Sequence, residues 1–252
     1  MSREAVIVAT ARTPIGKAYR GAFNDTDATT LGGHVVAEAV RRAGLDPAEV
    51  EDVVLGCAVQ QGTTGQNVAR FSALRAGLPN TVPGMTIDRA CSSGLMAVAA
   101  AARHIIVDGV QVTVGGGVES VSLVMNEHIN YDRIGDPWQR EHCPEMTTSM
   151  IETAEIVAER YGVSRESQDA YALQSQQRTA RAQVEGRYDA EMAPLTTRRR
   201  VQDKSTGAVT EQEVTLRLDE GNRPQTTLED LQKLRPVFKG GRFVAAGRFI
   251  TA

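Results

Sequence analysis

Two patterns of apolar residues alternate along residues 1–118 of the chain. Short continuous apolar runs, bounded by polar or turn residues, are typical of buried strands, whereas apolar residues three and four positions apart are typical of helices. Strands that alternate with helices predict a parallel or mixed sheet with helices on its faces. The strand-like runs are residues 4–11, 51–59, 83–90 and 110–117, and the helical segments are residues 29–45, 65–78 and 91–107.

The pattern changes after Ser120. Residues 122–148 are polar and irregular, and a loop of that length inside a compact domain is unusual and often functional. Two helical patterns follow, and Ser164 is the N-cap candidate of the second. A β-hairpin comes next, because a turn-forming Ser-Thr-Gly separates two strand-like runs. These three elements are residues 150–162, 164–187 and 196–217.

Composition and charge narrow the class of protein. Of the 252 residues, 41% are hydrophobic and 23% are charged, which is ordinary for a soluble globular protein with a sizeable core. The formal net charge of -3 argues against electrostatic binding of nucleic acid. The first residues enter a strand-like run directly and lack the order of a signal peptide, and no apolar run has the length of a membrane span. We therefore expect a cytoplasmic protein with neither a membrane nor a nucleic-acid partner.

The three cysteines of the chain bear on its cellular compartment and on whether it uses a thiol in catalysis. Cys57, Cys91 and Cys143 cannot all pair within one chain, and none lies in a C-x-x-C arrangement. Neither a disulfide framework nor a metal site is therefore expected. In a reducing compartment each cysteine is either buried filler or a thiol with a chemical role. Cys57 lies in an apolar strand-like run and fits the filler role, and Cys143 lies in the polar loop without a neighbour that would activate it.

Cys91 begins the helical segment of residues 91–107, which is apolar on nearly all sides and is therefore expected to be buried. The unpaired N–H groups and the positive dipole end of a helix's first turn favour a thiolate. The next three residues are small and leave room for a substrate at the sulfur. The residues alone leave two interpretations open, a nucleophile and a buried cysteine that packs as a small apolar side chain.

Other motifs carry weaker signals. Residues 112–120, "VTVGGGVES", combine a strand with three glycines, which fits either a phosphate cradle or a tight turn, because the spacing is not G-x-G-x-x-G. Residues 197–201, "TRRRV", favour a solvated hairpin edge over an anion site. The histidines are scattered, and their spacing does not place them near Cys91. They are His34, His104, His128 and His142.

Several segments, in one order, resemble the thiolases, which transfer acyl groups between coenzyme A thioesters. "DRACSSGLMAVA" resembles the nucleophile signature of the family, and "VIVATARTPIGKAYRGAF" resembles its opening strand and loop. "GQNVAR", "GGGVESVS" and "LRPVFK" resemble further thiolase segments. Residues 153–178 are similar to the helical start of the family's loop domain. The resemblance covers the whole chain.

The resemblance implies a layered α/β fold. Thiolases have two similar halves, and we expect here a mixed five-stranded sheet with helices on both faces and an inserted, mainly helical loop domain that covers the substrate. Residues 1–120 match the core of the first half, residues 121–245 match the loop domain, and residues 246–252 match the start of the second half. The match covers roughly the first two-thirds of a thiolase, so the second half is expected to be absent.

The resemblance also implies a set of site residues. Cys91 corresponds to the cysteine that attacks the acyl carbonyl and holds the acyl group as a thioester, from which a second coenzyme A takes it. Met150 matches a methionine that lines the pantetheine channel, and Ser149 stands where many members have a histidine. Arg223 matches an arginine that lies against the adenine nucleotide end of coenzyme A. Coenzyme A is a substrate here, and no cofactor is expected.

The family's other catalytic groups belong to its second half. They are a histidine in a Gly-His-Pro motif, an asparagine and a second cysteine, and this sequence has no counterpart of them. We therefore expect an acetyl-CoA C-acetyltransferase or 3-ketoacyl-CoA thiolase that turns over poorly by itself. The alternative is a non-catalytic acyl-CoA-binding or partner-dependent protein.

The resemblance also bears on partners. We expect a homodimer, a homotetramer or a separate chain that supplies the second half. Without the second half, one face of the inner helices would be exposed, and a large exposed apolar patch implies a partner or a tendency to aggregate.

Overall fold

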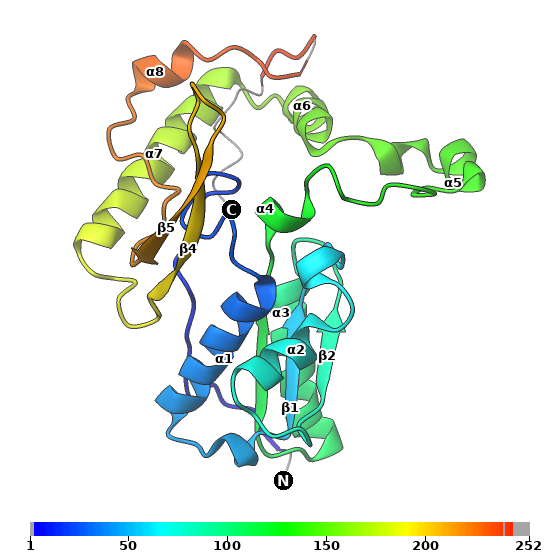
Figure 1. The fold of residues 1–252 in the computed structure, drawn as a ribbon. Coiled ribbons are helices and arrows are strands. Elements are labelled where there is room, and N and C mark those ends of the chain that lie inside the picture. The colour runs from blue at the N-terminus through cyan, green and yellow to red at the C-terminus, as the bar shows by residue number, and fades with distance from the viewer. Residues whose placement is uncertain (1–2, 239, 244–252) are drawn as a thin grey trace. The chain divides into compact units, whose positions relative to one another are not determined.

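A computed structural model describes residues 3–238 and 240–243 of the chain. The chain forms two compact units (Figure 1). The first unit comprises Met1–Asn130 and Asp189–Glu220, and the second comprises Tyr131–Tyr188 and Gly221–Ala252. The predicted strand-like end and the start of a second half, residues 246–252, lie outside the described residues.

The first unit is built on a parallel sheet in the strand order β2-β1-β3. A long antiparallel hairpin, β4 with β5, belongs to the same unit. The strands are β1 (Asp52–Gly56), β2 (Gly84–Ile87), β3 (Thr113–Gly117), β4 (Leu195–Gln202) and β5 (Val209–Leu216). The α-helices of this unit are α1 (Ala28–Ala43), α2 (Val68–Arg75), α3 (Ser93–Arg103) and α4 (Val121–Val124).

Helices cover both faces of this sheet, as expected for the layered α/β fold. Successive side chains of a strand point to opposite faces. Val53 and Leu55 on the central strand β1 belong to the core formed with α1 and α2, and Val54 between them packs against Ala97 and Ala101 of α3. Figure 1 accordingly shows α2 and α3 on opposite sides of β1. Burial of alternate β1 residues by different helices fixes the layer order.

The number of strands differs from the expectation. Among the described residues the sheet has three parallel strands rather than five mixed ones. The predicted strand over residues 4–11 is not formed, and its three larger apolar side chains are exposed, with Ile7 at 77% and both Val6 and Val8 at 72%. This prediction was wrong because an apolar run becomes a buried strand only when it pairs with a neighbour, and β3 pairs only with β1 in the described part of the chain.

The other predicted elements of the first unit are confirmed. Helix α1 ends where Gly44 adopts the left-handed conformation, with φ of 70°, and its N–H bonds to the carbonyl of Arg41. The hairpin, predicted as part of the loop domain, packs instead with the first unit, because Leu195 joins Ala22 and Phe23 in one apolar cluster. The domain boundaries at 120 and 245 themselves stay a prediction.

Ion pairs complete the attachment of the hairpin region. The Arg12 guanidinium lies 2.8 Å from an oxygen of Asp219 and 2.6 Å from an oxygen of Glu191, on either side of the hairpin. Arg42 on α1 donates to the carbonyls of Ala190 and Met192, each at 2.7 Å. These bonds hold the two ends of the hairpin against the chain's first residues and α1.

The second unit is mainly helical, in agreement with the expected loop domain. Arg165 at the start of the long helix α7 donates to the carbonyls of Leu231 and Leu234 and pairs with the buried Asp169 at 3.1 Å. Ser164 caps α7 as predicted. The loop predicted as irregular over residues 122–148 holds short helices, which its polar composition did not reveal. The helices are α5 (Pro137–His142), α6 (Met150–Tyr161), α7 (Arg165–Val184) and α8 (Leu228–Gln232).

Candidate functional site

Cys91 lies between the end of β2 and the start of α3, at the carboxyl edge of the parallel sheet. The carboxyl edge of a parallel sheet is where ligands bind in open α/β folds. The thiol is exposed to solvent, whereas the sequence left a buried filler open as the alternative. Helix α3 begins at Ser93 with Ser92 as its N-cap residue, so Cys91 precedes the first helical turn instead of lying in it.

A network of short hydrogen bonds shapes the turn around Cys91. The buried hydroxyl of Ser93 donates to the carbonyl of Ala90 at 2.6 Å and accepts from the N–H of Arg89 at 2.8 Å. The hydroxyl of Ser92 donates to the carbonyl of Arg89 at 2.8 Å. Ala90 has a φ of 47°, a left-handed conformation that costs a non-glycine residue energy. The turn is therefore held in one conformation and presents Cys91 outward.

The amino end of α3 remains available for an electrostatic role. The N-cap residue Ser92 makes no side-chain bond to the N–H groups of this helix, because its hydroxyl is used within the turn. Of these groups, the N–H of Ser93 bonds to the backbone carbonyl of Ala90 at 3.1 Å. The first N–H groups of a helix that are not capped favour negative charge nearby.

Glycine residues at the ends of two strands allow the turn that holds Cys91 to lie close to the sheet. A Cβ atom on Gly56, the last residue of β1, would lie 2.1 Å from the backbone carbon of Ser93. A Cβ on Gly117, the last residue of β3, would lie 3.0 Å from the Cα of Gly94. The backbone of α3 thus contacts the carboxyl ends of both strands directly, and this close approach fixes the position of Cys91 relative to the sheet.

Cys57 lies in a different environment from Cys91. It follows β1, is 1% exposed, and its sulfur donates to Glu119 Oε1 at 3.5 Å. Burial, followed by the negative charge of Glu119, raises the pKa of Cys57 from the ordinary 9.0 to about 11. Cys57 is therefore a protonated core thiol, in agreement with the predicted filler role. Cys143, at the end of α5, is half-buried.

The three residues proposed to bind substrate lie in the second unit. Ser149 caps helix α6, because its hydroxyl accepts a hydrogen bond from the N–H of Glu152 at 3.2 Å. Met150 is the first residue of α6, and its side chain is 75% exposed. Ser149 and Met150 are therefore brought together at the amino end of one helix. Cys91 belongs to the first unit.

Arg223 is exposed, and its backbone is fixed by helix α7. The side-chain oxygen of Gln176 accepts a bond from the N–H of Arg223 at 2.7 Å, and Asn222 donates to the same oxygen at 3.0 Å. The hydroxyl of Thr226 closes the turn by donating to the Arg223 carbonyl at 2.8 Å. The guanidinium therefore projects from an anchored backbone. Gln176 could not be predicted from the sequence, because a polar residue on a mostly polar helix gives no sign of which loop it contacts.

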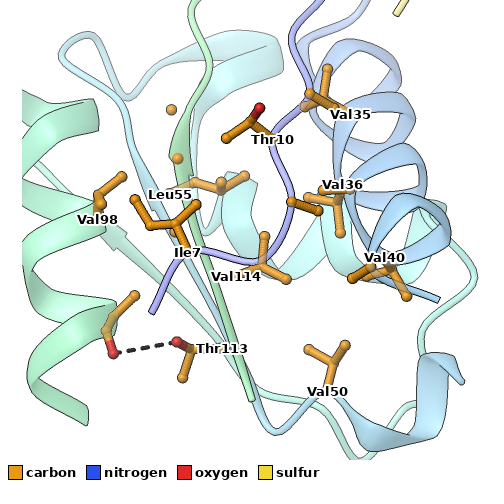
Figure 2. Close-up of a pocket in the computed structure, with 18 of the residues that line it drawn as sticks. Ile7, Thr10, Val35, Val36, Val40, Val50, Leu55, Val98, Thr113 and Val114 are labelled. Atoms are coloured by element: carbon orange, nitrogen blue, oxygen red, sulfur yellow. Dashed lines mark hydrogen bonds between the residues drawn. The ribbon is translucent and has the colours of Figure 1, made fainter. Parts of the chain in front are cut away.

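A cavity beside the sheet is not the site of Cys91. It measures about 570 Å³ and lies between residues 5–13, α1, β3 and α3. Figure 2 shows apolar side chains around it, among them Ile7, Val36 and Val114. Cys91 does not line it, so the cavity marks the apolar gap left between residues 5–13 and β3 and gives no evidence of a catalytic pocket.

No group of three or more metal-ligating side chains occurs in residues 3–238 and 240–243. The three glycines of residues 112–120 lie within strand β3, where they allow the close approach of α3, and they do not form the tight turn that the motif also fitted. Within the same described range, one helical stretch, Ala90–Asp108, is long and apolar enough to cross a membrane, with a mean hydropathy of 1.5. This finding corrects the expectation that no apolar run has the length of a membrane span, although a single such helix is weak evidence for one.

Comparisons with known proteins point to one family. Residues 5–251 match the family described as "Thiolase, N-terminal domain". The 3-ketoacyl-CoA thiolase of Bacillus subtilis (strain 168) is 41% identical over 248 residues, which cover 97% of this chain and 62% of that protein. A probable acetyl-CoA acyltransferase of Staphylococcus aureus (strain COL) is 35% identical, and the match covers 96% of this chain and 61% of that protein.

The fold agrees with these sequence matches. The crystal structure of the Bacillus anthracis acetyl-CoA acetyltransferase superposes with a TM-score of 0.80 at 35% sequence identity. The superposition covers 98% of this chain and 62% of that one. The chain therefore spans somewhat less than two-thirds of the length of the relatives that it matches.

Proposed function

Because the chain belongs to the thiolase family, whose N-terminal domain it matches over residues 5–251, we propose that it is an acyltransferase acting on acyl-coenzyme A thioesters. Cys91 is the acyl acceptor. The observation that carries this proposal is the exposed thiol of Cys91 beside the uncapped amino end of α3. An exposed thiol in an electropositive setting is the type of cysteine that acts as a nucleophile.

The proposed reaction proceeds in two steps. In thiolysis, the Cys91 sulfur forms a bond to the 3-keto carbon of a 3-ketoacyl-CoA, the bond between C2 and C3 breaks, and acetyl-CoA leaves after its C2 carbanion takes a proton. The thiolate of a second coenzyme A then attacks the Cys91 thioester, which releases acyl-CoA and returns the electron pair to the sulfur. The reverse sequence is the Claisen condensation of two acetyl-CoA molecules. Each covalent step is easier than direct transfer.

The second unit supplies the proposed contacts to coenzyme A. Met150 offers an exposed apolar side chain for the pantetheine arm, and Ser149 stands beside it. Arg223 offers a planar cation for the adenine nucleotide end, on a backbone that Gln176 holds in place. We propose no cofactor, because coenzyme A acts as a substrate.

The chain assayed by itself is proposed to turn over slowly. Its 252 residues contain no Gly-His-Pro motif, so the base that activates the nucleophile in thiolases has no counterpart here. Removing one member of a nucleophile–base unit removes most of the rate. The thiol of Cys91 can still accept an acyl group, but at a lower rate.

A second candidate function is that of an acyl-CoA-binding protein that needs a partner chain for turnover. The observation that favours it is an apolar stripe along α3 and the helical turn that follows it, His104–Asp108, defined by Leu95, Ala99, Ala102 and Ile106. Leu95 is 75% and Ile106 45% exposed, and the two alanines between them are half-buried. Apolar stripes on helices of folded proteins are normally covered. The cover in this proposal is a second copy, in a homodimer or homotetramer, or a chain that supplies a second thiolase half.

We also propose a cytoplasmic location. All three cysteines are free thiols in the structure. Free thiols persist in reducing compartments, whereas oxidising compartments favour disulfides.

Thiolysis of acetoacetyl-CoA by the purified chain tests the proposal. We expect slow turnover that Cys91→Ala abolishes and that the matched control Cys143→Ala retains. Turnover that survives Cys91→Ala would refute the acyl-acceptor role. Absence of turnover in the unmodified chain, together with coenzyme A binding that Arg223→Gln weakens about tenfold, would support the binding protein instead.

A further inference from the structure

A second cavity lies in the second unit, on the exposed face of helix α7, and measures about 390 Å³. That volume falls within the range of about 300–1,000 Å³ that is typical of small-molecule sites. The proposed acyl transfer does not use it, and Ser149, Met150 and Arg223 do not line it. Its lining includes the arginines Arg178, Arg181 and Arg187, the tyrosines Tyr171 and Tyr188, and the hydroxyl of Ser175.

The local fold explains why these side chains converge. Tyr171, Ser175 and Arg178 are spaced four and three residues apart on α7, so they lie on one face of the helix. After α7 the chain reverses at Gly186, which has a φ of 66°, and the N–H of Arg187 bonds to the carbonyl of Ala182 at 3.0 Å. This reversal returns the residues after the helix to its carboxyl end, where they complete the cavity wall.

The charge of the cavity is strongly positive. Its lining contains three arginines and no aspartate or glutamate. Arg187 pairs with Glu185 at 2.5 Å, but in the part of the chain that the structure describes neither Arg178 nor Arg181 has a carboxylate within ion-pair distance. Other arginines of the chain, such as Arg12 and Arg42, do have carboxylate partners. Two uncompensated guanidinium groups at one hollow favour an anionic ligand, and guanidinium geometry suits phosphate.

The tyrosines restrict the ligand further. Tyr171 precedes Arg178 by two helical turns, which is about 10 Å along the axis of α7. A bare phosphate is too short to contact both. A planar base linked to phosphates spans such a distance, and its face stacks on a tyrosine ring while its phosphates meet the arginines. The half-buried hydroxyl of Ser175 lies between Tyr171 and Arg178 on the helix, where it can form a hydrogen bond to the part of the ligand between its base and its phosphates.

We propose that this face of α7 binds a nucleoside diphosphate, at a site separate from the contact that Arg223 makes with coenzyme A in the proposed function. The guanidinium groups of Arg178 and Arg181 bind the phosphates, Arg187 supports them, and the tyrosines hold the base. The carboxyl end of α7 opposes an anion through the helix dipole, but this effect is small beside direct hydrogen bonds from several guanidinium groups.

Calorimetric titration of the full chain with ADP and with inorganic pyrophosphate tests the inference. We expect ADP to bind more tightly than pyrophosphate. Arg178→Gln with Arg181→Gln should weaken ADP binding at least about tenfold, because each variant removes a hydrogen bond to a charged group. Tyr188→Ala should weaken binding of ADP but leave that of pyrophosphate unchanged. The matched control Arg160→Gln removes an exposed arginine from the end of α6 and should leave both affinities unchanged.

Three outcomes would overturn the inference. The first is the absence of saturable ADP binding, and the second is ADP binding that the paired arginine variant leaves intact. The third is loss of ADP binding in Arg223→Gln alone, because the ADP would then occupy the proposed coenzyme A contact. Equal affinity for ADP and pyrophosphate would refute the role of the tyrosines and reduce the site to a simple anion contact. None of these outcomes alters the expected effect of Cys91→Ala on thiolysis.

Discussion

Cys57 and Cys91 lie in consecutive loops at the carboxyl edge of the same sheet, yet they differ in access to solvent. Cys57 is enclosed by β1 and the residues after it, where its sulfur contacts Glu119. Cys91 is exposed, on a turn that Ser93 holds through two hydrogen bonds. The sequence predicted the burial of Cys57 from its apolar strand-like run, but it left a buried and an exposed Cys91 open. It could not give the conformation of Ala90 or the hydrogen bonds of the turn.

The raised pKa of Cys57 gives a stability effect with a defined sign. Between the ordinary value of 9.0 and about 11, the unfolded chain has lost the thiol proton while the folded chain keeps it. The free energy of unfolding therefore falls as pH rises through this window. We expect the contribution of Cys57 to the free energy of unfolding to fall by roughly 2–3 kcal/mol across this window. Urea unfolding of the protein and of Cys57→Ala, repeated at several pH values across this window, measures this contribution. The same dependence of the unfolding free energy on pH in both proteins would contradict the expectation.

At the scale of elements, glycines connect β1 and β3 with α3. We expect Gly56→Ala to destabilise the fold by about 1–3 kcal/mol or more, because its Cβ would overlap the backbone of Ser93, which cannot rotate away. Gly94→Ala is the matched control, since its Cβ would meet its nearest neighbour at an ordinary 3.8 Å. Chemical denaturation of both variants measures the effect. Equal stability would mean that the close approach does not limit the position of α3.

Most elements of the first unit were predictable because each has a local signal. Helix α1 has an apolar stripe and a glycine stop, and β1 is a short apolar run. The run at residues 4–11 has the same signal, yet it forms no strand, since a strand needs a pairing partner that a local apolar run does not reveal. The contact of Gln176 with Arg223 is equally non-local. The nucleophile candidate was predictable from a motif, whereas the residues that anchor the site were not.

Across the whole molecule, the exposed side of α3 is the main departure from the sequence analysis. The helix was expected to be buried because it is apolar on nearly all sides, but only Ser93, Ala97 and Ala101 are buried. The resemblance to thiolases, in contrast, led to the expectation that an inner helix face would be exposed without a second half. The apolar stripe that begins at Leu95 is an exposed helix face of this kind.

The exposed stripe predicts self-association of the isolated chain. We expect the sedimentation coefficient to increase with concentration, and Leu95→Lys to reduce this increase, because a charge in the stripe opposes burial against a second surface. Val184→Lys is the control, since Val184 is 89% exposed on α7 and does not belong to the stripe. Analytical ultracentrifugation measures the effect. A chain that stays monomeric at all concentrations, or an equal response to both variants, would contradict the expectation.

Transfer of an acetyl group to the protein tests the role of Cys91 most directly, because it does not require a complete catalytic cycle. The purified chain is incubated with acetyl-CoA, digested and analysed by peptide mass spectrometry, while the released coenzyme A is measured. We expect one acetyl group on Cys91, released by added coenzyme A, and none on Cys57 or Cys143. An unmodified Cys91, or acetylation of Cys143 to the same extent, would contradict the proposed acyl acceptor.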